Sequence, residues 1–186
     1  MKDENGQESL EPLSAATPVI PSARDSKPIY FPVSLIKFVV MHFCTVGMYQ
    51  FYWFYKNWRL IQERDQSEAS PFWRTVFTFI YCYALFEKVR SSAASLKIDQ
   101  SISVQVLAGG WILLSMLWIL PDPYWLINFS SILFLIPVQQ AVNRINESMV
   151  PGHDRNERFT AWNMVAIVIG GVLFILGVIG TFVPRA

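Results

Sequence analysis

The longest stretch of the chain without Asp, Glu, Lys or Arg is residues 159–184, and its apolar part, residues 162–183, WNMVAIVIGGVLFILGVIGTFV, holds 22 residues. A helix of this length rises about 33 Å, enough to cross roughly 30 Å of bilayer hydrocarbon. Composition agrees, because only 16% of the 186 residues are charged, whereas soluble domains carry about 25%. The sequence therefore predicts an all-α membrane protein.

Four more apolar runs precede this segment. Residues 33–55, 104–120 and 124–142 are long enough for spanning helices, and the turn sequence "PDP" joins the last two into a hairpin. Residues 71–89 begin with a Ser-Pro helix start, but their uncharged part is only twelve residues long, which favours a short re-entrant or interfacial helix. The prediction is a polytopic helical protein with four spanning helices and one short helix, with five spans as the alternative.

The remaining parts of the chain are polar. Residues 1–31 mix proline with charged and small residues, so we expect a disordered N-terminal tail before a membrane domain over 32–186. Several apolar runs pass into polar sequence without a helix stop, which predicts helices that extend into the cytoplasm. Lys and Arg collect on one side of the membrane if residues 71–89 do not cross it. An arrangement that folds residues 33–55 back at Gly47 ranks close behind, so the side of the N-terminus stays open.

An aromatic and basic stretch, YQFYWFYKNWR, closes the first apolar run. Tyr and Trp gather at the headgroup level of membranes, and Lys and Arg flank them on the cytoplasmic side. We expect an interfacial anchor, with an aromatic cage for a lipid or a cation as the alternative. Its residues are Tyr49, Tyr52, Trp53, Tyr55, Lys56, Trp58 and Arg59.

Three ionisable residues lie in or beside apolar runs, where charge is costly and indicates function. Lys37 is near the end of its run and can snorkel to the interface. His42 is deeper, and it can bond a neighbouring helix or relay protons. Glu87 is expected to be an interfacial anchor, or a relay partner of Lys88 if its segment is buried.

Small residues form a stripe along 162–183, with Gly170 and Gly177 at its centre. Small side chains let helix backbones approach closely. We expect this stripe to pack against the chain's own third helix, at residues 108–110, with homodimerisation as the alternative.

The string CTVGMYQFYWFYKNW, residues 44–58, resembles a (T/C)-x-G-x-Y-x-x-Y-W-x-Y-K signature of small, uncharacterised bacterial inner-membrane proteins. Thr45, Gly47, Tyr49, Tyr52, Trp53, Tyr55 and Lys56 match it. The resemblance implies a multi-pass protein of a bacterial inner membrane, and it implies no activity.

No catalytic set, metal site or cofactor motif stands out, and a net charge of +1 gives no basis for binding nucleic acid. We therefore expect a non-enzymatic membrane scaffold or accessory subunit, whose partners are the lipid bilayer and other membrane proteins. The sequence sets no oligomeric state. The alternative is a small transporter or channel subunit, which would need a polar path lined by His42, Ser115, Asn128, Ser130, Ser131 and Gln139.

Overall fold

A computed structural model of the protein describes residues 27–98 and 103–183. These residues form helices and no strands, so the all-α prediction is confirmed. The helices are α1 (Leu35–Cys44), α2 (Met48–Asp65), α3 (Pro71–Val76), α4 (Thr78–Ser95), α5 (Val104–Met116), the 3₁₀-helices η1 (Leu117–Ile119) and η2 (Tyr124–Ser131), α6 (Ile132–Met149) and α7 (Ala161–Phe182).

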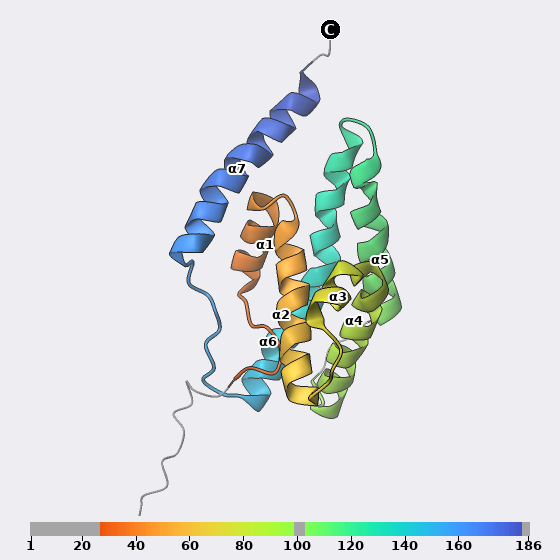
Figure 1. The fold of residues 1–186 in the computed structure, drawn as a ribbon, viewed down its shortest axis with the longest axis vertical. Coiled ribbons are helices and arrows are strands. Elements are labelled where there is room, and N and C mark those ends of the chain that lie inside the picture. Colours follow the sequence, from red (N-terminus) through yellow and green to blue (C-terminus); the bar gives the residue numbers. More distant parts are fainter. Residues whose placement is uncertain (1–26, 99–102, 184–186) are drawn as a thin grey trace, which may run out of the picture.

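The first apolar run is a helical hairpin and does not form one spanning helix (Figure 1). Helix α1 has 10 residues, so it rises only about 15 Å, half of the hydrocarbon thickness. The chain then reverses, and α2 runs back toward the end of the molecule where α1 began. The prediction of a span over 33–55 is wrong, and the alternative that folds back at Gly47 describes the structure.

Thr45 and Gly47 make this reversal. Gly47 has a φ of 81°, in the left-handed region that only glycine adopts without strain. The Thr45 hydroxyl donates to the Met41 carbonyl at 2.6 Å and accepts the Tyr49 N–H at 2.9 Å. One side chain therefore caps the end of α1 and the start of α2, two helix ends whose backbone groups would otherwise lack partners.

The second half of the bundle is a long hairpin, in which α5–η1 and η2–α6 run antiparallel and meet at the "PDP" turn. By length and composition, two helical stretches of the described chain could cross a membrane: Tyr124–Met149 and Ala161–Phe182. The Val104–Ile119 stretch is apolar but shorter. Residues 71–89 divide at Phe77 into the short α3 and the start of α4. Four spans are therefore not supported.

Helix α7 lies along one side of the bundle and leans across the end of α1 (Figure 1). Its most apolar window has a mean hydropathy of 2.6, and none of that window is buried in the protein, against 44% for Tyr124–Met149. A helix this apolar with no buried residue needs an apolar surrounding. A bilayer is one surrounding of this kind.

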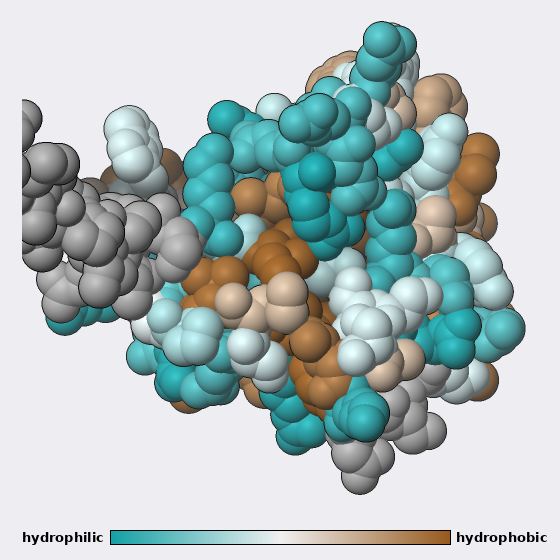
Figure 2. Space-filling view, turned by 90° about the horizontal axis from the view of Figure 1, so that it is seen from below, coloured by the Kyte–Doolittle hydropathy of each residue, from teal (hydrophilic) through white to brown (hydrophobic). Residues whose placement is uncertain are grey.

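The opposite end of the molecule is polar. Seen from below, hydrophilic residues border a hydrophobic strip in the middle of this face (Figure 2). Exposed ion pairs lie here, such as Lys88 with Asp65 at 2.9 Å, which ties α4 to the end of α2. Each exposed pair contributes only about 0–1 kcal/mol to the stability of the fold. The main effect of these charges is therefore to keep this end of the molecule hydrated.

Residues 27–31, which the sequence places in the disordered tail, pack into the bundle, and Tyr30 is fully buried. Asn146 accepts the N–H groups of Ile29 and Tyr30 at 3.0 Å each, and it donates to the Tyr30 carbonyl at 2.8 Å. The tail prediction is wrong for these residues, because side-chain amides satisfy their backbone groups. Residues 1–26 lie outside the described part of the chain.

Candidate functional site

The aromatic stretch of α2 divides between two faces of the helix. Trp53 and Trp58 are buried in the core at 0% and 1% exposure, and Tyr49 is nearly buried. Tyr52 is 47% exposed, and Lys56 and Arg59 follow it at helical spacing. The predicted anchor therefore contributes rings to the protein core as well as to the surface, because the stretch covers more than one face of a helix that packs against α3 and α4.

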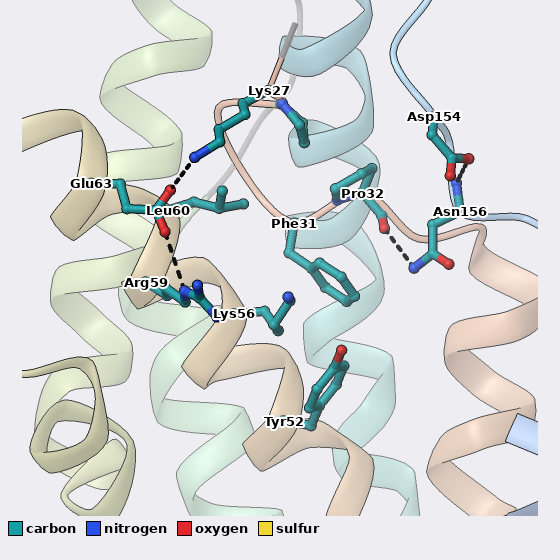
Figure 3. A pocket seen from close by; sticks show the side chains of 11 residues that line it. Lys27, Phe31, Pro32, Tyr52, Lys56, Arg59, Leu60, Glu63, Asp154 and Asn156 are labelled. Atoms are coloured by element: carbon teal, nitrogen blue, oxygen red, sulfur yellow. Dashed lines mark hydrogen bonds and ion pairs between the residues drawn. The ribbon is translucent and has the colours of Figure 1, made fainter. Parts of the chain in front are cut away.

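The exposed face of α2 lines a groove of about 530 Å³ (Figure 3). Its other walls are the extended segment before α1 and the loop before α7. The lining residues are Lys27, Pro28, Phe31, Pro32, Tyr52, Lys56, Arg59, Leu60, Glu63, Asp154 and Asn156.

The charges of this groove are unevenly paired. Glu63 accepts hydrogen bonds from Lys27 Nζ at 3.1 Å and Arg59 Nε at 3.2 Å, and these bonds lower the pKa of its carboxyl group. Lys56 Nζ lies 5.7 Å from the Phe31 ring centroid and 5.9 Å from that of Tyr52. It makes no ion pair with any described carboxylate. The groove thus holds three cations against two carboxylates, and the Lys56 ammonium and the Asp154 carboxylate make no ion pair with a described residue.

These rings do not form an empty cage for an external cation. The Phe31 and Tyr52 rings meet edge to face with centroids 5.6 Å apart, and both already face the Lys56 ammonium. A second cation here would be repelled by Lys56. The geometry favours a negatively charged ligand.

A second groove of about 370 Å³ lies between α2 and α3 and shares Tyr52 with the first. Its lining is almost wholly apolar, and the residues are Phe51, Tyr52, Tyr55, Phe72, Thr75 and Val76. A charged groove and an apolar groove therefore adjoin at one tyrosine.

Lys37 does not snorkel into solvent. It is 2% exposed, and its Nζ donates to Asn156 Oδ1 and to the Arg158 carbonyl, both at 2.7 Å. It also lies 5.8 Å from the Phe159 ring centroid. Lys37 therefore fixes the loop between α6 and α7 against α1.

His42 is buried near the hairpin turn, and neither ring nitrogen makes a hydrogen bond of ordinary geometry in the described chain, although the backbone of Phe129 lies close to the ring. Its ring meets Phe129 edge to face at 5.9 Å. Ser115 and Ser131 also carry buried hydroxyl oxygens without partners among the described residues. Such orphaned polar groups each cost about 1–3 kcal/mol, which makes them candidates for a function.

Glu87 and Lys88 do not form the relay pair considered for a buried segment. Glu87 is partly exposed and pairs with Arg90 on its own helix, and Lys88 pairs with Asp65 on α2. The Glu87 carboxyl has its pKa lowered by the hydrogen bond from Arg90.

Gly170 and Gly177 differ in their surroundings. A Cβ added at Gly170 would lie 1.7 Å from the carbonyl oxygen of Cys44, at the end of α1. The nearest atom to one added at Gly177 belongs to Trp125, at an ordinary 3.9 Å. The partner of Gly170 is thus α1 and not residues 108–110, where Gly110 meets the ring of Phe134 instead.

A set of side-chain amides went unrecognised in the sequence. Gln139 accepts from Trp53 Nε1 and donates to the Val33 carbonyl at 3.2 Å, and Asn143 donates to the same carbonyl at 2.9 Å. On α2, Asn57 accepts the Phe31 N–H at 3.1 Å. The spacing of Gln139, Asn143 and Asn146 was a usable signal, since it places three amides on one helix face.

Two more observations limit the chemistry of the described chain. No group of three or more His, Cys, Asp or Glu side chains in it is placed to hold a metal ion. Cys44 and Cys82 are both free. The groove beside α2 is therefore the best candidate site, and it offers binding groups rather than reactive ones.

Comparisons with models of known protein families, with curated proteins and with solved structures find no match to this chain. The resemblance of residues 44–58 to small bacterial inner-membrane proteins therefore stays a prediction. Any function has to be inferred from the geometry of α2 and its neighbours.

Proposed function

We propose that this chain is an integral protein of a bacterial inner membrane that acts as a non-enzymatic scaffold or accessory subunit. In this proposal α7 and the α5–α6 hairpin cross the bilayer, and the α1–α2 hairpin enters it from the cytoplasmic side and leaves on the same side. The polar ends of α2, α4 and α6 then form one cytoplasmic platform for other membrane proteins.

The observation that carries the proposal is the division of the molecule into two ends. Helix α7 is apolar, and every one of its residues is at least partly exposed. Paired charges and buried amides are instead concentrated around the C-terminal halves of α2 and α6. Polar side chains at this end form hydrogen bonds with backbone groups of the segment before α1, so they hold that segment in place. A rigid polar platform on an apolar base suits a subunit that holds partners in place.

Membrane fractionation and reconstitution test this proposal together. The protein should stay with the inner membrane after alkaline carbonate extraction, since peripheral proteins are released by that treatment. When reconstituted into vesicles, it should leave their permeability to protons and small ions unchanged. Release by carbonate would refute the membrane assignment, and a specific flux would refute the scaffold role.

A small transporter or channel subunit is the second candidate, and the orphaned polar groups favour it. His42, Ser115 and Ser131 are buried and make no side-chain hydrogen bond of ordinary geometry in the described chain, and His42 lies beside a helix break of the kind that transporters use for binding sites. Gln139 does not join such a path, because its amide is fully used in bonds to Trp53, Val33 and Asn143. A proton or ion flux that depends on His42 would favour this second role.

A further inference from the structure

We propose that the two adjoining grooves beside α2 form a binding site for one anionic phospholipid. The charged groove takes the phosphate and headgroup, and the apolar groove takes the start of an acyl chain. This inference rests on the proposed membrane location, and it adds a ligand of defined chemistry to the platform.

Lys56 and Arg59 leave hydrogen-bond donors unused, and these donors are the first argument for this site. Lys56 Nζ has no ion pair in the described chain and faces only two aromatic rings. Arg59 bonds Glu63 through Nε alone, so its two Nη groups point to no described acceptor. An ammonium and a guanidinium one helical turn apart are suited to the oxygens of one phosphate group.

The order of apolar and charged residues along the groove is the second argument for this site. Helix α2 runs from the turn at Gly47, inside the apolar part, to Asp65 at the polar end. Tyr52 therefore lies on the membrane side of the groove, and Lys56, Arg59 and Glu63 follow in order toward water (Figure 3). A phospholipid changes from apolar to charged in the same direction.

The second groove distinguishes a lipid from free phosphate. It meets the charged groove at Tyr52, and its wall between α2 and α3 includes Phe72 and Val76, which are 57% and 50% exposed. Inorganic phosphate would have no use for this apolar surface, whereas an acyl chain would cover it.

The charge of the site selects among lipids. The charged groove has one net positive charge, and its two rings already face the Lys56 ammonium. The ammonium of phosphatidylethanolamine would find no free ring and a like charge beside Lys56, and Asp154 is the one lining carboxylate without an ion pair in the described chain. An anionic headgroup such as that of phosphatidylglycerol would avoid this repulsion.

The test measures lipid binding to the purified full-length protein in an uncharged detergent, by native mass spectrometry and by thermal unfolding. The probes are phosphatidylglycerol, phosphatidylethanolamine and inorganic phosphate. We expect phosphatidylglycerol to bind about tenfold more tightly than phosphatidylethanolamine, as one charge-assisted interaction would give, and to raise the unfolding temperature most.

Matched variants locate the site. Lys56→Gln should weaken phosphatidylglycerol binding about tenfold, and Lys56→Arg should keep it. Lys97→Gln removes the same charge from an exposed position outside the groove and should change nothing. Val76→Trp, which fills the apolar groove, should also weaken lipid binding.

Several results would overturn the inference. Equal effects of Lys56→Gln and Lys97→Gln would mean a nonspecific charge effect, and equal loss in Lys56→Gln and Lys56→Arg would mean that charge is not the cause. Protection by inorganic phosphate as strong as by the lipid would identify a free-phosphate site. If the protein resists carbonate extraction but shows none of the lipid preference, only the lipid site fails and the proposed function stands.

Discussion

At the scale of single residues, Gln139 joins more separate parts of the chain than any other side chain discussed above. Its amide on α6 bonds Trp53 of α2, the Val33 carbonyl before α1 and Asn143 on its own helix. Gln139 and Trp53 are fully buried, so without this amide the Trp53 Nε1–H would lose its acceptor without gaining water, while the Val33 carbonyl would keep its bond from Asn143. The cost of removing one such amide is therefore larger than one ordinary hydrogen bond.

We predict that Gln139→Leu lowers the free energy of unfolding by about 2 kcal/mol, because it leaves the buried Trp53 indole N–H without an acceptor. Gln140→Leu makes the same change at the next residue, which is exposed, and should alter stability by less than about 0.5 kcal/mol. Thermal unfolding in detergent measures both. Equal losses from the two variants would show that the amide network does not hold the segment before α1.

His42 gives the opposite expectation. Because neither ring nitrogen makes a hydrogen bond of ordinary geometry in the described chain, replacing the ring with an apolar side chain removes an uncompensated polar group. We predict that His42→Leu leaves the unfolding temperature unchanged or raises it. A fall comparable to that of Gln139→Leu would mean that His42 bonds a group outside the described residues, such as water or a ligand.

At the scale of elements, the contact between α7 and α1 depends on one glycine. Gly170 sits against the Cys44 carbonyl oxygen, where even a Cβ would clash at 1.7 Å, while nothing lies within 4 Å of a Cβ at Gly180. Both residues belong to α7, so they provide a matched pair within one apolar helix.

We predict that Gly170→Leu separates α7 from α1 and Gly180→Leu does not. The expected result is a lower unfolding temperature in detergent and faster proteolysis of the loop between α6 and α7 for Gly170→Leu alone. Both variants keep α7 apolar, so both should still insert into membranes. Equal stability of the pair would mean that α7 is not docked on α1.

The elements also show what the sequence could predict. Helical periodicity and apolar length identified α7 and the α5–α6 hairpin, since these depend on local sequence and hydropathy. The only sequence signal for the break in residues 33–55 was the pair Thr45 and Gly47. Whether the chain folds back there depends on tertiary contacts, which a hydropathy pattern does not report. The exposed members of the anchor, Tyr52, Lys56 and Arg59, do line the candidate groove. Phe31 and Asn156 also line this groove, although they are far from α2 in the sequence. No local sequence pattern could predict their position there.

At the scale of the whole molecule, the number of crossings depends on the α1–α2 hairpin. Counting apolar runs gives four or five spans, but α1 has only 10 residues and α2, with 18 residues, runs back beside it. In the proposed membrane location this hairpin therefore enters and leaves on one side. The same reversal brings the segment before α1 to the polar end, where Asn57 and Asn146 bind its backbone. The central claim is therefore that the two ends of this hairpin lie on the same side of the membrane.

Site-directed labelling with a membrane-impermeant maleimide tests this claim most directly. The chain would carry a tag at its N-terminus and one new cysteine, either Glu68→Cys in the loop after α2 or Tyr124→Cys at the tip of the α5–α6 hairpin; both positions are exposed. The unsubstituted chain, with Cys44 and Cys82, gives the background labelling. The account predicts that the tag and Glu68→Cys are reached from the cytoplasmic side and Tyr124→Cys from the other side. A tag and a Glu68→Cys label on opposite sides would mean that residues 33–55 cross the membrane, and would contradict the account.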